Sequence, residues 1–179
     1  MWKKNGFILA IVVILAGLAV YQSVSNSDRQ TSLPAEEAPQ TNYLAPTFTL
    51  TGLDGKEYTV GGARDKPMLV NFWASWCGPC EEEAPELVDV YKKYEGQFDL
   101  YAVNVTPGDK IENIKKFVEQ YKYPFPVLLD KQGTNADTYK VIAIPTSFLI
   151  DKNGVVRDVI HVVSPKELDK KISQLIKST

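Results

Sequence analysis

The chain has 179 residues, of which 44% are hydrophobic and 23% are charged, a composition typical of one globular domain with additional terminal segments. Its formal net charge of −2 gives no reason to expect a nucleic-acid partner. Two cysteines and one histidine cannot supply the four Cys/His ligands of a closed zinc site, so structural zinc within one monomer is excluded.

The N-terminal segment has the pattern of a membrane anchor. Residues 1–5 contain Lys3 and Lys4, and residues 6–24 form a run without charge. About 20 apolar residues span a bilayer as a helix, and this run reaches that length when its last residues contribute at the interface. We therefore predict an uncleaved signal-anchor helix over residues 6–24, with cleavage at Gly17-Leu18-Ala19 as the alternative. The preceding lysines place residues 1–5 in the cytosol and the remainder of the chain outside.

A linker and a folded domain are expected after this anchor. Residues 25–46 are rich in Ser, Asn, Gln, Thr, Glu and Pro and have no apolar period, which predicts a linker. Such a linker would hold the domain off the membrane while keeping it near membrane-bound partners. The domain is then expected over residues 47–179.

The domain is predicted to alternate strands and helices. Strand-forming residues flank Asp54-Gly55, which predicts a β-hairpin, and Met68–Trp73 is apolar except for Asn71, as expected of a central parallel strand. Ser164 and Glu167 have the spacing of a capping box for the last helix. This order predicts an α/β fold with a mixed sheet covered by helices on both faces. The remaining expected elements are strands at 100–105, 125–129, 147–151 and 155–163 and helices at 82–94, 111–121 and 136–139, with a last helix from Pro165.

The only two cysteines, Cys77 and Cys80, have the C-x-x-C spacing and follow the apolar strand directly. A strand that leads into the first turn of a helix would place Cys77 at the helix N-terminus, where unpaired N–H groups and the helix dipole favour a thiolate. We therefore expect Cys77 to be the nucleophile. Cys80 would lie one turn further on, close enough to form a disulfide and to resolve a mixed disulfide at Cys77.

The chain also resembles the TlpA/ResA-like thioredoxins, which are membrane-tethered and extracytoplasmic. The resemblance lies in Trp76-Cys77-Gly78-Pro79-Cys80, in Ala45–Leu50 and Lys66–Trp73 before it, and in Ile144-Pro145-Thr146 and the segment after that. It covers about residues 45–179. It implies a thioredoxin fold with an N-terminal β-hairpin added to the minimal unit.

The resemblance also implies roles for individual residues. Pro145 is expected to follow a cis peptide bond in a loop that faces Cys77, and the backbone of Ile144 is expected to pair with an extended substrate chain. Glu83 matches an acid characteristic of ResA-like proteins, which would accept the proton of Cys80. A buried aspartate of cytosolic thioredoxins matches Asn71, whose amide cannot accept that proton. Partial burial would raise the pKa of Glu83 toward a useful value.

The remaining expectations concern the rim of the site. Trp76, Gly78 and Pro79 are assigned to the substrate-binding surface, and Trp73 to packing behind the site. His161, the sole histidine, is expected to be structural or exposed rather than a metal ligand or base. Val162 stands near a position where relatives often have glycine, so the edge of the site is expected to differ from theirs.

The function implied by the resemblance is thiol-disulfide exchange on the extracytoplasmic face of the cell membrane. The protein would reduce disulfides in client proteins of cytochrome c maturation or of envelope or spore assembly. A membrane electron donor of the CcdA/DsbD type would regenerate the dithiol, because no glutathione pool protects thiols in that compartment. We expect a monomer that needs no metal and no cofactor beyond the redox-active disulfide.

Three alternatives remain open from the sequence. A disulfide oxidase or isomerase would use the same site, and the redox potential would separate them. A thiol peroxidase would need a Pro-x-x-x-Thr/Ser-x-x-Cys arrangement, which the residues before Cys77 lack. A copper chaperone of the Sco type would need a C-x-x-x-C pair and a distant histidine. The spacing here is one residue shorter, and His161 would have to reach the cysteines.

Overall fold

The fold was analysed in a computed structural model that describes residues 12–18, 20–22 and 34–177. Residues 12–18 and 20–22 are helical, and they form a unit separate from residues 34–177. Within the described residues, no helix combines the length and the apolar character needed to cross a membrane. The predicted anchor at 6–24 lies partly outside the described residues, and residues 25–33 of the predicted linker lie wholly outside them.

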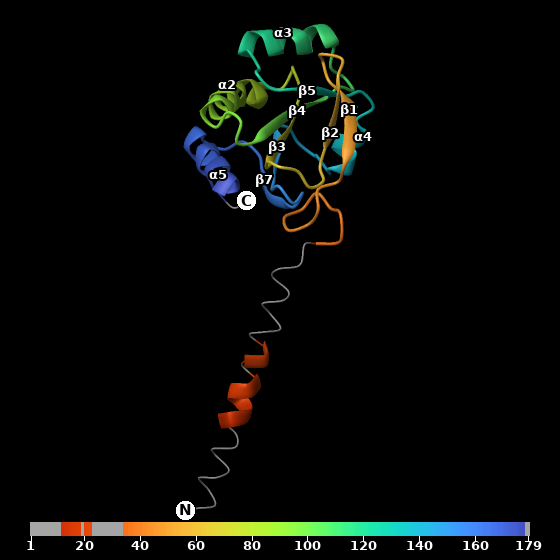
Figure 1. The fold of residues 1–179 in the computed structure, drawn as a ribbon. Coiled ribbons are helices and arrows are strands. Elements are labelled where there is room, and N and C mark those ends of the chain that lie inside the picture. The colour runs from red at the N-terminus through yellow and green to blue at the C-terminus, as the bar shows by residue number, and fades with distance from the viewer. Residues whose placement is uncertain (1–11, 19, 23–33, 178–179) are drawn as a thin grey trace, which may run out of the picture. The chain divides into compact units, whose positions relative to one another are not determined.

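The core of the domain is a five-stranded mixed sheet in the order β5-β4-β3-β6-β7 (Figure 1). The central strand β3 pairs in parallel with β4 and antiparallel with β6, while β4–β5 is parallel and β6–β7 antiparallel. This confirms the predicted mixed sheet with a parallel strand at its centre. The strands are β3 (Met68–Trp73), β4 (Asp99–Val105), β5 (Val127–Asp130), β6 (Thr146–Ile150) and β7 (Val156–Ile160).

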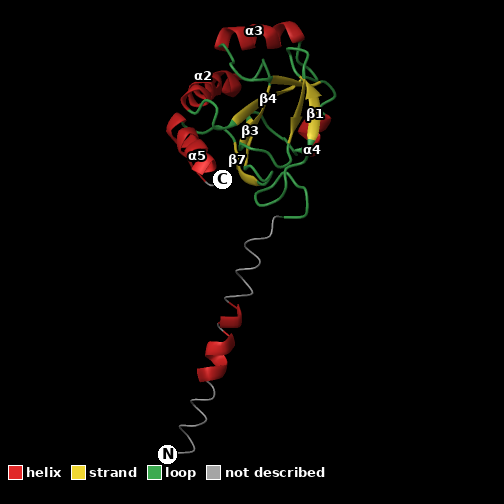
Figure 2. Cartoon of the chain, viewed as in Figure 1, coloured by secondary structure: helices red, strands yellow, loops and turns green. Residues whose placement is uncertain are grey.

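All six residues of β3 are buried because helices cover both faces of the sheet (Figure 2). Side chains alternate along a strand, so Leu69 and Trp73 join one apolar cluster while Val70 and Phe72 join the other. The first cluster contains buried residues of α2 (Gly78–Lys93), α3 (Ile111–Tyr121) and α5 (Pro165–Lys177). The second contains Ala136 of the short helix α4 (Thr134–Thr138). Helices on both faces match the prediction.

The predicted hairpin is present as β1 (Phe48–Thr51) and β2 (Glu57–Val60), with Gly55 at φ 82° in the turn. It lies against the edge strand β5, since the backbone N–H of Leu53 donates to the carbonyl of Val127 at 2.7 Å. The hairpin therefore covers backbone groups at an edge of the main sheet that would otherwise face solvent.

Residues 34–46 differ from the prediction of a linker, because they pack on the domain. The backbone N–H of Asn42 donates to Val156 at 2.8 Å, Val156 donates to Tyr43 at 2.9 Å, and Ala45 donates to Gly154 at 2.8 Å. Ala45 is fully buried. The contacts are mostly between backbone groups, which every residue type carries. The side chains therefore show no apolar period, and the sequence gives no sign of these contacts.

Strand β7 ends at Ile160, three residues before the predicted end at Val163. Its partner β6 begins at Thr146, directly after Pro145, and Ser147 pairs with Ile160. Proline has no N–H to donate, so the ladder has no regular continuation past this point.

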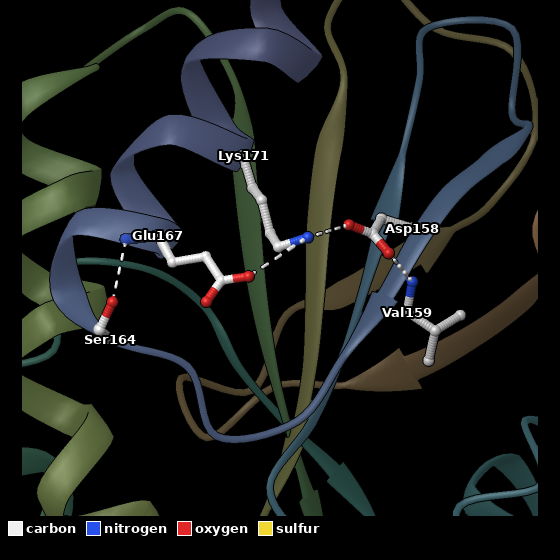
Figure 3. Close-up of polar contacts among 5 residues, drawn as sticks. All are labelled: Asp158, Val159, Ser164, Glu167 and Lys171. Atoms are coloured by element: carbon white, nitrogen blue, oxygen red, sulfur yellow. Dashed lines mark hydrogen bonds and ion pairs between the residues drawn. The ribbon is translucent and has the colours of Figure 1, made fainter.

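The last helix, α5, begins at Pro165, and Ser164 caps it as predicted, since its hydroxyl accepts from the backbone N–H of Glu167 at 3.3 Å (Figure 3). The Glu167 carboxylate, which a capping box would direct back to Ser164, faces Lys171. Lys171 lies one turn further along α5. Its ammonium group lies 2.6 Å from Asp158 of β7 and 3.8 Å from Glu167. These pairs connect the helix to the outer strand of the sheet.

Candidate active site

The two cysteines lie where β3 gives way to α2, and they form a disulfide. Cys77 is the N-cap residue of α2, with φ −92° and ψ 108°, and Pro79 lies in the first turn, where a missing N–H costs nothing. The backbone N–H of Cys80 donates to the sulfur of Cys77 at 3.2 Å. This helix N-terminus therefore directs an N–H group at the sulfur of the expected nucleophile, where negative charge would be stabilised.

Both sulfurs are shielded, but one side of the motif is open. Cys77 and Cys80 retain 5% and 2% of their accessible surface, whereas Gly78 and Pro79 are exposed and Trp76 is 63% exposed. A client must therefore approach over these exposed residues. Trp76 lies at the surface, as predicted for the rim.

The loop before β6 lies opposite Cys77. The Ile144–Pro145 peptide bond is cis, as predicted, and the carbonyl oxygen of Ile144 lies 3.6 Å from the Cys77 sulfur. The loop after β3 and the loop before β6 thus meet at the sulfur of Cys77, the predicted nucleophile. The backbone of Ile144 is placed where an extended client segment could pair with it.

Glu83, three residues after Cys80 on α2, is buried with 5% of its surface exposed. Burial raises the pKa of its carboxyl from 4.5 to about 7, the hydrogen bond from Asn71 opposes that rise, and the nearby charge of Glu86 adds to it. A carboxyl with this pKa can take up or release a proton near neutral pH. Cys80, one helical turn away on the same helix, is likewise buried.

Asn71 of β3 is the partner that orients Glu83. Its amide donates to Glu83 Oε2 at 3.1 Å and to the Ser147 hydroxyl at 3.0 Å. The second carboxylate oxygen, Oε1, makes no hydrogen bond to any residue in the part of the chain described here. Asn71 thus fixes one oxygen of the carboxyl group and leaves the other able to accept a proton.

Aromatic residues pack behind the site. Trp73 is buried, and its ring lies 4.5 Å from Phe117 and 5.7 Å from Tyr123 between centroids. Burial raises the pKa of the Tyr123 phenol, and the negative charge of Glu83 adds to this effect. Trp73 therefore packs behind the site, as predicted, in the same buried cluster as Cys77 and Cys80.

His161 is exposed, and its Nδ1 lies 3.0 Å from the hydroxyl of Thr146. That hydroxyl donates to the Ala143 carbonyl at 2.7 Å, so it can only accept from His161, and Nδ1 must carry the proton. The histidine thus supports the loop around Pro145, which agrees with its predicted structural character.

Two residues near the cysteines were missed by the sequence analysis. Asp109, in the loop after β4, accepts hydrogen bonds from the backbone N–H and the hydroxyl of Ser75. Ser147 of β6 accepts from Asn71. Neither belongs to a motif, so only the pairing of strands that are distant in the sequence reveals them.

Comparisons with known proteins give a consistent result. The model of the AhpC/TSA family matches residues 41–159. The thioredoxin-like protein YneN of Bacillus subtilis is 36% identical over 96% of this chain and 98% of its own length. The thiol-disulfide oxidoreductase ResA of Bacillus cereus is 35% identical over 92% of this chain and 93% of its own.

Solved structures with the same fold include thiol-disulfide proteins. StoA from Bacillus subtilis is 25% identical and superposes with a TM-score of 0.62 over 70% of this chain and 95% of its own. A thiol:disulfide interchange protein of the thioredoxin family from Chlorobium tepidum is 28% identical, with a TM-score of 0.66 over 74% and 95%. The predicted thioredoxin-like fold is therefore confirmed.

Proposed function

Because the chain belongs to the AhpC/TSA family and is a thiol-disulfide oxidoreductase of the ResA type, we propose that it reduces disulfides in client proteins on the extracytoplasmic side of the cell membrane. The observation that carries the proposal is the pairing of two features on α2. The Cys77–Cys80 disulfide lies at its N-terminus, and Glu83, with a pKa of about 7, is buried one turn beyond Cys80. A dithiol needs such a base to complete exchange at neutral pH.

The reaction begins when the Cys77 thiolate attacks one sulfur of a client disulfide. The other client sulfur leaves as a thiolate and takes up a proton. Cys80 then gives its proton to the Glu83 carboxylate and attacks the sulfur of Cys77, which releases the second client sulfur to be protonated in turn. Two electrons pass to the client, which becomes a dithiol, while Cys77 and Cys80 become a disulfide.

The geometry supports distinct roles for the residues around the pair. The Cys80 N–H, 3.2 Å from the Cys77 sulfur, stabilises the thiolate that attacks the client disulfide. The Ile144 backbone, next to Cys77, would hold the client as an added extended segment. Trp76, Gly78 and Pro79 form the exposed surface over which the client passes.

The surroundings of the protein are part of the proposal. Lys3 and Lys4 before the uncharged run at 6–24 support an anchor with its N-terminus in the cytosol. A membrane electron donor of the CcdA/DsbD type would return two electrons to the disulfide after each turnover. Proteins with thiols that must stay reduced, such as apocytochrome c, are the proposed clients, and the relatives named thiol-disulfide oxidoreductases support exchange with disulfides of this kind. The protein would act as a monomer without a further cofactor.

The reduction potential of the Cys77/Cys80 couple in the full chain tests the direction of exchange. A value near that of thioredoxin, about −270 mV, is expected for a reductase, whereas a value near −120 mV would make the protein a disulfide donor. A thiol reagent that cannot cross membranes, applied to intact cells, tests location. After brief reduction of the cells, it should label Cys77 of the wild-type chain, and protection of Cys77 until the cells are opened would refute the extracytoplasmic assignment.

A further inference from the structure

The loop that carries the nucleophile is held by a carboxylate from a neighbouring strand end. Ser75 lies two residues before Cys77, and both of its polar groups bind Asp109. Its backbone N–H donates to Asp109 Oδ2 at 2.7 Å, and its hydroxyl lies 2.5 Å from Oδ1. Two hydrogen bonds from one residue to the two oxygens of one carboxylate fix both the position and the orientation of the loop.

Asp109 is itself fixed by two further hydrogen bonds. The buried amide of Asn104, near the end of β4, donates to Oδ2 at 2.9 Å, and the backbone N–H of Lys110 donates to Oδ1 at 2.9 Å. Asn104 pairs in register with Trp73, the last residue of β3. The carboxylate therefore joins the ends of the two parallel strands and attaches the Ser75 loop to the rigid sheet.

We propose that Asp109 is a positioning residue for disulfide exchange, which keeps the sulfur of Cys77 beside the backbone N–H of Cys80 while the Cys77–Cys80 bond is open. This inference rests on the exchange reaction proposed above. In the disulfide form, the covalent bond to Cys80 restrains Cys77 against α2. When two electrons and two protons open that bond, the non-covalent contacts of the loop must supply the restraint. The contact with Asp109 should therefore stabilise the dithiol form more than the disulfide form.

Asp130 offers a comparison within the same sheet. It ends β5 and accepts from the backbone N–H groups of Asn135 and Ala136 at 3.1 and 2.9 Å and from the Asn135 amide at 3.0 Å. Its side chain accepts three hydrogen bonds where that of Asp109 accepts four, but the segment it holds is α4, which belongs to the other apolar cluster. Substitution of either residue is therefore expected to lower the stability of the fold. Only substitution of Asp109 is expected to shift the dithiol–disulfide equilibrium of Cys77 and Cys80.

The test is the equilibrium of the full chain with a glutathione buffer, measured for the wild type and for Asp109→Ala, Ser75→Ala and the double variant. Asp109→Ala removes hydrogen bonds to a charged group, and this loss should destabilise the dithiol form more than the disulfide form. The equilibrium should therefore shift toward the disulfide by about three- to tenfold. Ser75→Ala should shift it in the same direction by less. The double variant should match Asp109→Ala, because both changes remove one contact.

The sign of the shift separates positioning from charge. Removal of a negative charge alone would favour the Cys77 thiolate and shift the equilibrium toward the dithiol. Ser75→Ala leaves the charge of Asp109 in place, so its shift reports on positioning alone. If Asp109→Ala does not fold, the equilibrium with glutathione is measured for Ser75→Ala and Asp109→Asn instead. An unchanged equilibrium, a shift toward the dithiol, or an equal shift in Asp130→Asn would overturn the inference. Failure of the wild type to exchange with glutathione would instead refute the proposed function.

Discussion

The protonation of Glu83 gives a prediction that can be worked out quantitatively from the structure. Its pKa is raised from 4.5 to about 7 by burial, and each pKa unit corresponds to 1.36 kcal/mol. The folded chain therefore favours the protonated carboxyl over the carboxylate by about 3 kcal/mol relative to the unfolded chain. Because only 5% of the side chain is exposed, solvent screening reduces this value little.

The sign follows from proton binding. Between pH 4.5 and about 7, folded Glu83 holds a proton that the unfolded chain has released, so the free energy of unfolding falls as the pH rises through this range. The contribution of Glu83 is fully present below pH 4.5 and is lost above pH 7. Glu83→Gln removes the titration, so the stability of the variant minus that of the wild type should rise by about 3 kcal/mol between pH 4 and pH 8.

Urea unfolding of the disulfide form at several pH values measures this difference directly. Glu82→Gln is the matched control, because it removes a carboxylate from the same helical turn at an exposed position. A stability difference that does not change with pH would refute the assignment of a raised pKa to Glu83. Glu83→Gln should also resolve mixed disulfides more slowly than the wild type. In the wild type, release of a chromophoric thiol from Cys77 should accelerate as the pH rises through about 7.

Three further changes test the site and its support. Cys80→Ser should trap clients as mixed disulfides on Cys77, visible on non-reducing gels, and the absence of trapped species would argue against Cys77 as nucleophile. Asp151→Ala should lower the free energy of unfolding by about 3 kcal/mol in urea, because the buried carboxylate binds one guanidinium and two backbone N–H groups. Trp73→Ala should cost about 3–5 kcal/mol through loss of packing on Phe117, and a cost below 1 kcal/mol would contradict its burial.

The sheet and helices were largely predictable because side-chain patterns carry the information. Met68–Trp73 has the predicted bounds, since a run of six residues that is apolar except for Asn71 is typical of a strand buried on both faces. Helix α3 also has its predicted bounds of Ile111–Tyr121. The packing of residues 34–46 was not predictable, because backbone hydrogen bonds hold them and the side chains show no period. The end of β7 depended on where β6 begins, which is a property of the pair rather than of either strand.

Some residues of the candidate site could likewise be predicted from the sequence and others could not. Cys77 and Cys80 could be identified from local spacing, and the cis bond before Pro145 only from the family pattern, since most X-Pro bonds are trans. Asp109 could not be predicted, because its role depends on the alignment of two strand ends that are 31 residues apart in the register Trp73–Asn104. The residue type at position 71 shows by itself that an amide stands there, which cannot accept a proton. The structure adds that this amide instead donates to the residue that can.

The pair Asn71 and Glu83 shows how two opposed effects set one pKa. Burial alone would raise the pKa of the Glu83 carboxyl further, while the hydrogen bond from Asn71 favours the carboxylate and lowers it. A general base works best when its pKa lies near the working pH, because a lower value weakens the base and a higher value leaves it protonated. An apolar residue in place of Asn71 would remove the opposing effect and keep Glu83 protonated at neutral pH. In the proposed exchange, the amide on β3 is therefore what would allow a carboxyl group in the core to accept the Cys80 proton.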